Sequence, residues 1–439
     1  MKSGLIAIFL LLGTVLSTRS GELPRREEER MDSMIRRELS ARAFPGAAFL
    51  CGTADQTLYT HNYGDLDYTH TVPVTDSTLY DVASCTKVLS TTFVLMRLYD
   101  QKKISLERTV GEFLPRFAGT PLTTLTIQEL LTHTSGLKPT VVYPDLIKPA
   151  HGGKLFNGHR NEQYPYLVDQ NLYMVRNVVQ DSVYLSGVPR PGYRQIADSL
   201  WVNPSVDTIM ARKIIRSYDP GRRGRYLYND TNMYLLRLIA ERITGRTLEE
   251  STAELFAELG CTDTGYRPLE WTSRERIAPT ENDKLLRRGP IQGFVHDELA
   301  AVSGGAGGNA GLFSTASDIA RFCQMILNNG SYNGRQIITP ATIDTFTSSP
   351  LSAKGIYRGL GFDKPDMQNT KKSPTCEEAP ECVYGHTGYT GTAFWVDPEN
   401  DLIFIFLSNR VYAHRWNTAL MSLNIRPRIQ SVIYQSIKD

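Results

Sequence analysis

The hydrophobic pattern near the start of the chain predicts a surface helix followed by two strands. Residues 24–42 carry a dense run of charges, and their apolar positions recur at helical spacing: Met31, Met34, Ile35 and Leu39. The apolar run GAAFLCG after Pro45 and the stretch 58–63 are typical of strands, and the residues 54–56 between them favour a turn. We expect the helix to lie against a sheet that contains both strands.

The C-terminal part of the chain shows the same elements in the opposite order. The segment FWVDPENDLIFIFLSN predicts a hairpin that turns at 398–400, and residues 415–437 predict a closing helix. Strands at both ends of the chain, with helices between them, predict one sheet that the two chain ends complete together.

The middle of the chain is predicted to be mostly helical. Residues 84–100 contain no Gly or Pro, Thr126 and Glu129 have the spacing of a capping box, and further helices are expected at 231–244, 247–259 and 315–329. Residues 138–224 are rich in Tyr, Pro, Gly and Asn and lack a sustained period, so we expect an insertion of loops and short helices. Long loops of this kind commonly shape a binding site.

The first twenty residues are typical of a targeting sequence rather than of a structural element. Lys2 precedes an apolar run at 5–16, which has the length of a secretory core and is shorter than the ~20 residues of a spanning helix. Residues 1–20 are therefore interpreted as a signal peptide with cleavage near Ser17 or Ser20, and an uncleaved anchor is the alternative. We expect an exported protein, periplasmic or secreted, with no stable membrane span.

The rest of the chain, residues 21–439, is interpreted as one domain. Its sheet region would comprise about 24–80 and 330–439, and its helical region about 81–329 with the insertion at 138–224. The hydrophobic content of 41% and charged content of 21% are those of a globular protein with a large core. The formal net charge of +2 argues against nucleic acid and acidic membranes as partners, and six cysteines are too few for a disulfide scaffold.

Three short motifs carry candidate chemistry. Ser84-Cys85-Thr86-Lys87 at a helix start places a hydroxyl and an ammonium on one face, where the helix N-terminus favours a developing alkoxide. Tyr228-Asn229-Asp230 precedes a helix, and a Lys near a buried Tyr would lower the phenol pKa enough for a general base. The glycines of 385–391 would let the backbone approach a ligand closely. Taken singly, each motif also fits a helix cap, a surface turn or a Gly-rich strand turn.

The three motifs in this order resemble the serine β-lactamase and penicillin-binding protein family. The similarity extends over about residues 25–437 and is to the exported branch with class C-like esterases and D-Ala-D-Ala carboxypeptidases. Segments 130–137, 294–297 and 308–314 also recur in this branch. The resemblance implies an α/β (α+β) fold, with an antiparallel sheet flanked by terminal helices, an inserted mostly helical region, and the site in the cleft between them.

The resemblance also implies a role for each motif residue. Ser84 would be the acylated nucleophile, Lys87 would share its proton, and Tyr228 would be the general base. Asp230 would stand where many members have Asn, and the third motif would contact substrate or oxyanion through His386, Thr387, Gly388 and Tyr389. The backbone N–H groups of Ser84 and Tyr389 would form the oxyanion hole.

Two departures from the family pattern bear on specificity. His386 stands where β-lactamases usually have Lys, and an imidazole of ordinary pKa, about 6.5, is mostly neutral at pH 7 and charged as the pH falls toward 6. Asp230, when ionised, cannot donate a hydrogen bond as an Asn amide does. We therefore expect uncharged esters to be preferred over carboxylates at pH 7, and an esterase or peptidase rather than an efficient β-lactamase.

The sequence thus predicts an exported serine hydrolase that acts through a Ser84 acyl-enzyme on an ester or a D-residue peptide, with a small molecule or cell-wall peptide as substrate. The alternatives are an acyltransferase that passes the acyl group to an alcohol or amine, a β-lactamase, and a slowly acylated penicillin-binding sensor. We expect no cofactor and no metal, and structural hydrogen bonds for His133 and His296. Cys376 and Cys382 would form a disulfide or stay free, and Cys85 should be free.

Overall fold

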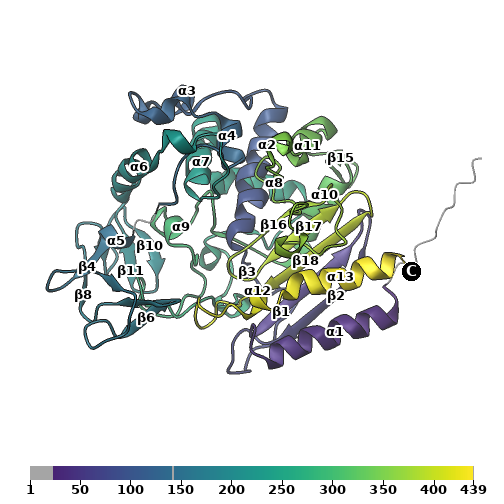
Figure 1. Ribbon diagram of the computed structural model, residues 1–439, viewed down its shortest axis with the longest axis horizontal. Helices are drawn as coiled ribbons and strands as arrows, with labels where there is room; N and C mark the ends of the chain where they lie inside the picture. Colours follow the sequence, from purple (N-terminus) through teal and green to yellow (C-terminus); the bar gives the residue numbers. More distant parts are fainter. Residues whose placement is uncertain (1–22, 141–142, 439) are drawn as a thin grey trace, which may run out of the picture.

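In the computed structural model, which describes residues 23–140 and 143–438, a five-stranded antiparallel sheet joins the two ends of the chain (Figure 1). The strand order is β16-β17-β18-β1-β2. The bounds are β1 Gly46–Gly52, β2 Thr57–Gly64, β16 Tyr384–Thr387, β17 Ala393–Asp397 and β18 Leu402–Ser408. Phe49 of β1 is in register with Phe406 of β18, so the N-terminal and C-terminal strands are direct neighbours. The predicted sheet, completed by both chain ends, is confirmed.

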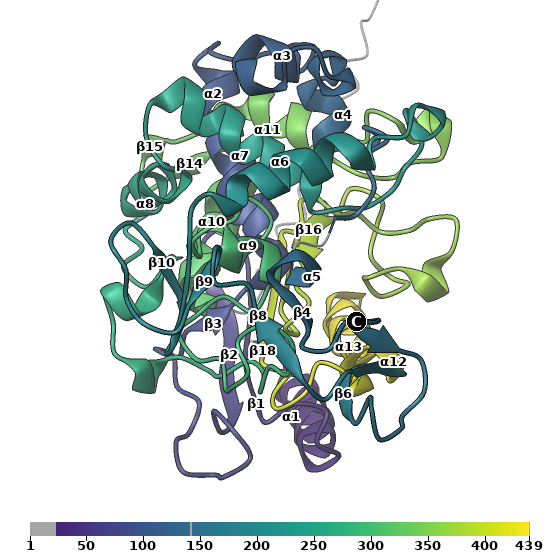
Figure 2. The ribbon, with the colours of Figure 1, turned by 90° about the vertical axis from the view of Figure 1, so that its left-hand side faces the viewer.

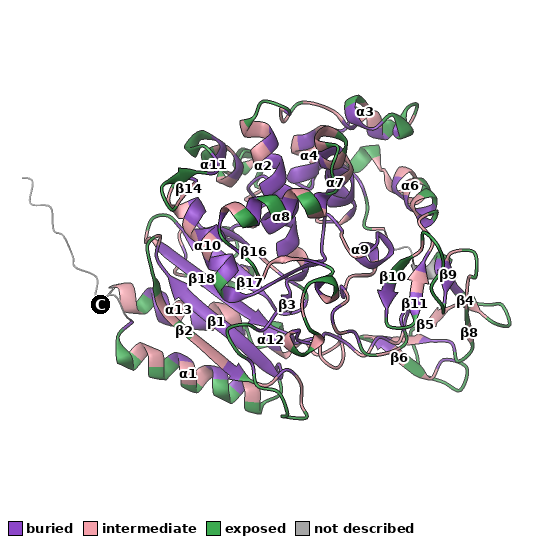
Figure 3. Ribbon diagram, turned by 180° about the vertical axis from the view of Figure 1, so that it is seen from behind, coloured by how far each residue is buried: buried purple, intermediate pink, exposed green. Residues whose placement is uncertain are grey.

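Both faces of this sheet are covered, which explains why its central strands are continuous apolar runs. Phe49 and Phe406 belong to a core that also holds Met31 and Ile35 of helix α1, Arg25–Ser40, and residues of α13, Ile425–Lys438. Figure 1 shows α1 and α13 side by side along the sheet. In Figure 3, β1 and β18 are buried, β2 is mostly intermediate or exposed, and the outer side of α1 is exposed. The predicted surface helix is thereby confirmed.

The predicted closing helix is divided in two. A short helix α12, Ala419–Ser422, precedes α13, and the left-handed backbone of Asn424, with φ of 51°, separates them. A residue with positive φ cannot continue a right-handed helix, so the α-helical run starts again one residue later.

The opposite face of the sheet packs on the helical region (Figure 2). Helix α10 lies against β1, β17 and β18. The helices of this region are α2 Phe93–Asp100, α3 Val110–Phe113, α4 Ile127–Leu131, α7 Thr231–Thr244, α8 Leu248–Glu258, α9 Glu298–Val302, α10 Ala316–Leu327 and α11 Pro340–Thr347. The predicted capping box is present, because Glu129 N–H donates to Thr126 Oγ1 at 3.1 Å and Thr126 N–H to Glu129 Oε2 at 2.8 Å. The helices expected at 231–244, 247–259 and 315–329 are confirmed within one or two residues at each end.

The insertion differs from its prediction as loops and short helices. It contains two helices, α5 Tyr143–Leu146 and α6 Val206–Ser217, but most of its regular structure is short antiparallel strands. They are β4 Ile147–Pro149, β5 Phe156–Asn157, β6 Tyr166–Asp169, β7 Leu172–Met174, β8 Val178–Gln180, β9 Leu185–Ser186, β10 Arg194–Ala197 and β11 Leu200–Val202. Strands of two to four residues are too short to display an alternating pattern, and that explains the wrong prediction.

A small three-stranded sheet leads into the site. Its order is β12-β13-β3, with β3 Tyr80–Asp81, β12 Gly265–Tyr266 and β13 Leu312–Ser314. A separate two-stranded hairpin joins β14 Ser331–Tyr332 and β15 Arg335–Gln336. Because β3 ends just before Ser84, this sheet fixes the start of the chain segment that carries the first motif.

The last predictions to compare with the structure concern the signal peptide, a membrane span and the cysteines. The predicted signal peptide, residues 1–20, lies outside the described residues. Within residues 23–140 and 143–438, no helix is both long enough and apolar enough to cross a membrane. All six cysteines lie in this part of the chain and are free, so the structure has thiols rather than a bridge at Cys376 and Cys382, and Cys85 is free as expected.

Candidate active site

Ser84 lies in a tight turn whose backbone is held by a buried carboxylate. The turn is a 3-10 segment, Ala83–Cys85, followed by a π-helical stretch, Lys87–Thr92, that leads into α2. The N–H of Ala83, which has a left-handed φ of 46°, donates to Asp81 Oδ1 at 2.9 Å. The other oxygen of Asp81 accepts the N–H of His296 at 2.7 Å. Asp81 therefore fixes an unfavourable backbone conformation directly before Ser84, a role that sequence reasoning did not find.

Lys87 is fully buried, and its ammonium is shared among three oxygens. Its Nζ lies 2.8 Å from Ser84 Oγ, 3.1 Å from the carbonyl oxygen of Asn309 and 2.6 Å from Asp230 Oδ1. Burial disfavours the charge, but the Asp230 carboxylate and Tyr228 outweigh it and raise the pKa of Lys87 above its ordinary value. Lys87 is a cation in this site, and it donates a hydrogen bond to the Ser84 hydroxyl.

Tyr228 lies between two cations. Lys87 Nζ is 5.0 Å from the centroid of its ring and Arg358 Cζ is 5.6 Å from the same centroid. The phenol also hydrogen bonds with Lys87 and Ser84. Burial raises the pKa of Tyr228 above its ordinary value, although Lys87 acts in the opposite direction. The prediction of a lowered phenol pKa is therefore wrong: desolvation outweighs the neighbouring ammonium, and the ring is a neutral phenol.

Asp230 is the solvent-exposed partner in the ion pair with Lys87. Its side chain is 39% exposed while that of Lys87 is inaccessible, so the ion pair between them runs from the interior toward solvent. The segment around Asp230 is fixed by its neighbours: Asn229 Nδ2 donates to the Leu137 carbonyl at 2.8 Å, and Asn232 Nδ2 contacts His133 Nδ1 at 3.0 Å. The predicted structural role of His133 is thereby confirmed.

The third motif begins on strand β16. The Nδ1 of His386 lies 2.7 Å from the carbonyl oxygen of Thr387, and because a carbonyl only accepts, Nδ1 carries the hydrogen. Burial, Arg358 and Lys87 lower the pKa of His386 well below its ordinary value, so the ring is neutral and Nε2 carries a lone pair. The neutral imidazole expected at pH 7 is confirmed. The expected protonation toward pH 6 is wrong, because the ring is buried beside two cations, Arg358 and Lys87.

Gly388 brings the rest of the motif against the Ser84 turn. A Cβ on Gly388 would lie 2.0 Å from Thr392 Oγ1 and 2.5 Å from the Val82 carbonyl oxygen, so only glycine fits. Thr392 Oγ1 donates to that same carbonyl at 3.0 Å. The side chain of Tyr389 is 46% exposed at the rim, where it stacks on His296 with ring centroids 5.7 Å apart. The structure thus brings all three predicted motifs together.

Two carboxyl groups that the sequence analysis did not select bind residues next to the motifs, Asp297 through Asn309 and Glu281 through His296. The backbone carbonyl oxygen of Asn309 accepts a hydrogen bond from the Lys87 ammonium. The side-chain Nδ2 of Asn309 donates to Asp297 Oδ1 at 2.9 Å. Burial and the charges of Asp230 and Glu298 raise the pKa of Asp297 to about 6. On the other side, His296 Nε2 lies 2.6 Å from Glu281 Oε2, which confirms the predicted structural hydrogen bond of His296.

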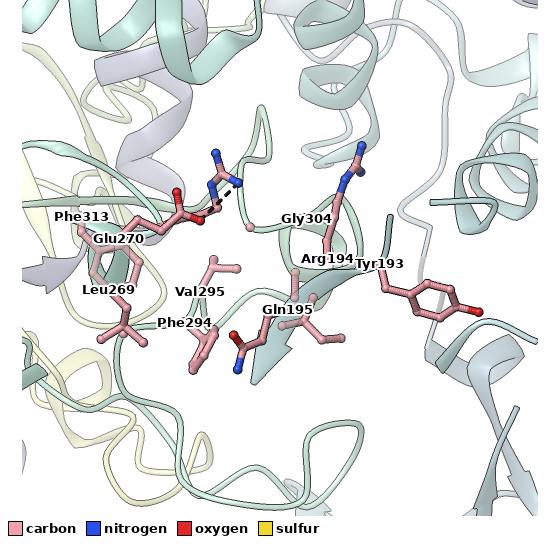
Figure 4. Close-up of a pocket in the computed structure, with 14 residues that line it drawn as sticks. Tyr193, Arg194, Gln195, Leu269, Glu270, Phe294, Val295, Gly304 and Phe313 are labelled. Atoms are coloured by element: carbon pink, nitrogen blue, oxygen red, sulfur yellow. Dashed lines mark ion pairs between the residues drawn. The ribbon is translucent and has the colours of Figure 1, made fainter. Parts of the chain in front are cut away.

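A cavity outside the candidate active site is not lined by the motif residues. A cavity of about 330 Å³ between β10 and the loop at 293–305 contains the Arg267–Glu270 ion pair, and Figure 4 shows Arg194 and Phe294 at its walls. None of the eight predicted site residues lines it. Among residues 23–140 and 143–438, no group of three or more His, Cys, Asp and Glu side chains is arranged to hold a metal ion.

Comparisons with known proteins agree with this arrangement. The family model described as "Beta-lactamase" matches residues 25–421. A protein of Escherichia coli (strain K12) named "Putative D-alanyl-D-alanine carboxypeptidase" is 30% identical over 362 residues, covering 78% of this chain and 71% of that protein. The N-acetylmuramyl-L-alanine amidase of Bacillus subtilis (strain 168) is 28% identical over 425 residues, 90% of this chain and 84% of that one.

The fold is also found in solved structures. A penicillin-binding protein homologue from Caulobacter crescentus superimposes with a TM-score of 0.61 at 18% identity, covering 95% of this chain and 99% of that one. At that identity the likeness concerns the fold alone, and it confirms the predicted antiparallel sheet with terminal helices and an inserted helical region.

Proposed function

The chain belongs to the β-lactamase family, and from that premise we propose that it is a serine hydrolase in which Ser84 is acylated by an ester or by a peptide with a D-residue. The observation that carries this proposal is the chain of contacts from Ser84 Oγ to Lys87 Nζ at 2.8 Å and from Lys87 Nζ to Asp230 Oδ1 at 2.6 Å. A hydroxyl, an ammonium and a carboxylate in line supply a nucleophile and a path for its proton.

The proton path follows from the charges in the resting site. Lys87 is protonated, so it cannot take the hydroxyl proton of Ser84 until it has released one of its own. The Asp230 carboxylate, at 2.6 Å, accepts that proton, and the amine of Lys87 then accepts the Ser84 proton as the oxygen attacks the carbonyl carbon. Asp230 thus acts as a proton acceptor. An Asn amide at this position could not, because an amide takes up no proton at ordinary pH.

Tyr228 acts in this scheme as a neutral proton carrier. Its phenol hydrogen bonds with both Lys87 and Ser84, and a hydroxyl accepts one proton while it donates another. It therefore delivers a proton from the Lys87 side to the leaving group, and in the reverse direction it takes a proton from the incoming water. This role needs no phenolate, which agrees with the raised pKa of Tyr228.

The developing oxyanion is proposed to lie between the backbone N–H groups of Ser84 and Tyr389. Thr392 ties the third motif to Val82 at 3.0 Å, two residues before Ser84, and Gly388 permits the close approach. Donors held by such backbone contacts are placed before the reaction begins, so they need little reorganisation in the transition state.

Water is proposed as the acyl acceptor, and cell-wall peptides or small esters as the substrates. The alternatives of an acyltransferase and a slowly acylated penicillin-binding sensor share the first half-reaction and differ in the fate of the acyl-enzyme, whereas a β-lactamase differs in its substrate. The two relatives named as a D-alanyl-D-alanine carboxypeptidase and an N-acetylmuramyl-L-alanine amidase favour hydrolysis of an amide of a cell-wall peptide. We further propose that residues 1–20 direct export, as the apolar run at 5–16 supports, and that residues 21–439 form one domain.

Intact-mass measurement after exposure to esters, D-peptides and β-lactams tests this proposal. A mass increase equal to the acyl group, mapped to the peptide that contains Ser84, supports it, and loss of the adduct in water distinguishes a hydrolase from a slowly acylated sensor. An added alcohol or amine that appears in the product would instead indicate an acyltransferase. Turnover without any adduct and with full activity in Ser84→Ala would refute the proposal.

A further inference from the structure

The carbonyl oxygen of Asn309 differs from the other two oxygens around the Lys87 ammonium. Those two belong to Ser84 and Asp230, which lose and gain a proton in the proposed reaction. The Asn309 carbonyl exchanges no proton, and it lies 3.1 Å from Lys87 Nζ. Asn309 is also buried, with 2% of its surface exposed. This carbonyl is therefore a contact that can hold the Lys87 side chain while protons move.

That contact matters most after Lys87 has passed a proton to Asp230. The neutral amine has two N–H bonds and one lone pair, and the lone pair must point at Ser84 Oγ to take its proton. The stem of a lysine is flexible, so the chain alone does not set the direction of the amine. An N–H bond donated to the Asn309 carbonyl fixes the rotation of the amine and leaves the lone pair for Ser84 Oγ, which is 2.8 Å away.

The chain before Asn309 is too flexible to fix this carbonyl by itself. Glycines occupy positions 304, 305, 307 and 308, and glycine has more conformational freedom than any other residue. Thr91 Oγ1 donates to the carbonyl of Gly308 at 2.7 Å, which holds the segment just before Asn309. Asn309 itself is held by its side chain, whose Nδ2 donates to Asp297 Oδ1 at 2.9 Å. The direction of the Asn309 carbonyl therefore depends on Asp297.

Asp297 is in turn fixed by the start of helix α9. It is the N-cap residue of that helix, and its Oδ1 accepts the N–H of Ala300 at 2.8 Å. The same oxygen thus accepts one hydrogen bond from the helix and one from the Asn309 amide. Because the helix cap restricts the rotation of the Asp297 side chain, Asn309 is held at a fixed distance from α9.

The residue before Asp297 is tied to the opposite side of the site. The backbone N–H of His296 donates to Asp81 Oδ2 at 2.7 Å, and Asp81 Oδ1 accepts the N–H of Ala83, next to Ser84. Two consecutive residues, His296 and Asp297, thus hold the turn with the nucleophile and the carbonyl that contacts Lys87. Their covalent link relates the two partners of the proton transfer to each other from outside the first motif.

We propose that Asp297 is a positioning residue, which orients the amine of Lys87 toward Ser84 by fixing the carbonyl of Asn309. This inference rests on the proposed acyl-enzyme function and adds to it a residue that acts through another residue. The path runs from Asp297 Oδ1 through the Asn309 amide to the Asn309 carbonyl and then to Lys87 Nζ. Asp297 exchanges no proton in this role.

The rate of Ser84 acylation by an uncharged ester tests the proposal, measured on the full chain at pH 8. Asp297 is ionised there, since its pKa is about 6. Asp297→Ala removes the acceptor of the Asn309 amide, so acylation should slow ~10-fold or more, while the ester concentration that gives half the maximal rate changes less than about 3-fold. Asp297→Asn keeps an oxygen that accepts from both Ala300 and Asn309, so its rate should stay within about 3-fold of wild type.

A double-mutant cycle with Asn309→Ala tests the path itself. This variant keeps the backbone carbonyl and loses only the amide, so it should slow acylation as much as Asp297→Ala does. The double variant should be no slower than either single variant, because both remove the same contact. Thr247→Ala is the control for a lost helix cap, since Thr247 Oγ1 accepts the N–H of Glu250 at 3.2 Å at the start of α8, and it should acylate at the wild-type rate.

Three results would overturn the inference: the wild-type rate in Asn309→Ala, equal losses in Asp297→Asn and Asp297→Ala, or losses that multiply in the double variant. Asn309→Ala leaves the cap of α9 in place, so the inference stays testable even if Asp297→Ala does not fold. Ser84 would still be acylated in each of these cases, whereas a wild-type protein without a Ser84 adduct would refute the proposed function. The two proposals therefore fail separately.

Discussion

The ammonium of Lys87 lies 2.6 Å from Asp230 Oδ1, and the two groups face opposite environments: the lysine is inaccessible to solvent and the aspartate is 39% exposed. A buried ammonium without a partner would lose its proton or destabilise the fold. Asp230 prevents both outcomes, since its charge helps raise the pKa of Lys87. A carboxylate at this position, where the family resemblance implies an amide, therefore affects the protonation state of Lys87 and not only a contact to substrate.

Replacing Ser84 with Ala should abolish ester cleavage without unfolding the protein. The hydroxyl accepts a hydrogen bond from Lys87 at 2.8 Å, and its loss removes the nucleophile while most contacts remain. We expect a fall in kcat of at least ~1,000-fold, measured with a chromogenic ester, and little change in the thermal midpoint. Ser40→Ala, at the end of α1, should leave both values unchanged. Turnover at the wild-type rate in Ser84→Ala would contradict the assignment.

Asp230→Asn should change the pH dependence of the reaction as well as its rate. The amide no longer holds the charge of Lys87, so the pKa of Lys87 falls, and no carboxylate remains to accept its proton. At pH 7 we expect a loss of roughly 100-fold in kcat/KM for an uncharged ester. The residual activity should rise with pH as the amine loses its proton, whereas the wild-type profile stays flat over that range.

The measurement is a pH–rate profile of both proteins from mildly acidic to alkaline conditions. Asp219→Asn, in a loop where Asp219 pairs with Lys138, is the control for a lost surface carboxylate and should follow the wild-type profile. If Asp230→Asn has the wild-type rate and profile, proton transfer from Lys87 to Asp230 is excluded.

The local parts of this site were predictable from the sequence because helical spacing determines them. Ser84 and Lys87 are three residues apart, so one turn brings their side chains together, and the resemblance to a known family supplied Tyr228 and His386. Asp81 and Arg358 were missed for different reasons. Asp81 acts through the backbone of Ala83, and nothing in an Asp at that position marks such a role.

Arg358 could not be found from spacing, since it reaches the site from a segment with no regular secondary structure. Its guanidinium lies over the rings of Tyr226 and Tyr228, a contact between parts of the chain more than a hundred residues apart, and its charge helps lower the pKa of His386. The short strands of the insertion were missed for a similar reason, because each holds only a few residues and depends on its partner strand. Contacts distant in sequence thus account for what the pattern could not predict.

His386 should not titrate in the range where an ordinary histidine does. Burial, Arg358 and Lys87 lower the pKa of His386 well below 6.5, so the ring stays neutral as the pH falls from 7.5 to 6. The ratio of kcat/KM for a carboxylate ester to that for its uncharged counterpart should therefore stay constant over this interval. A ratio that rises toward pH 6 in wild type, but not in His386→Gln, would show that the imidazole becomes charged.

Thiol labelling should find one accessible cysteine in the native protein. Only Cys382 is more than slightly exposed, and burial together with Asp397 raises the pKa of its thiol to about 11, so its reaction at pH 8 should be slow. The five buried thiols should react only after unfolding, for a total of six. Four thiols in the denatured, unreduced protein would instead indicate a bridge.

Acid should destabilise the protein in part through Glu281. Burial opposes its charge, but contacts with His296 at 2.6 Å and with Arg415 at 2.8 Å lower the pKa of Glu281 to about 2. A carboxyl whose pKa is lower in the folded state stabilises that state above its unfolded pKa of about 4.3. This contribution, up to about 3 kcal/mol in the free energy of unfolding, is lost as the pH falls from about 4.3 toward 2.

Glu281→Gln isolates this effect because it removes the titrating group while keeping its shape. At pH 7 it leaves Arg415 and His296 without their shared carboxylate, which should cost about 3–5 kcal/mol in urea unfolding. At pH 3 the unfolded wild-type chain has largely protonated Glu281 while the folded state still holds it ionised, so part of the stabilisation is gone and the difference between the two proteins should shrink. Asp283, whose pKa is also lowered by its contact with Arg287, titrates in both proteins and cancels from the comparison. Glu270→Gln, an exposed replacement, should show no such convergence. A Glu281→Gln deficit that is equal at pH 7 and pH 3 would mean that folding does not lower the pKa of Glu281.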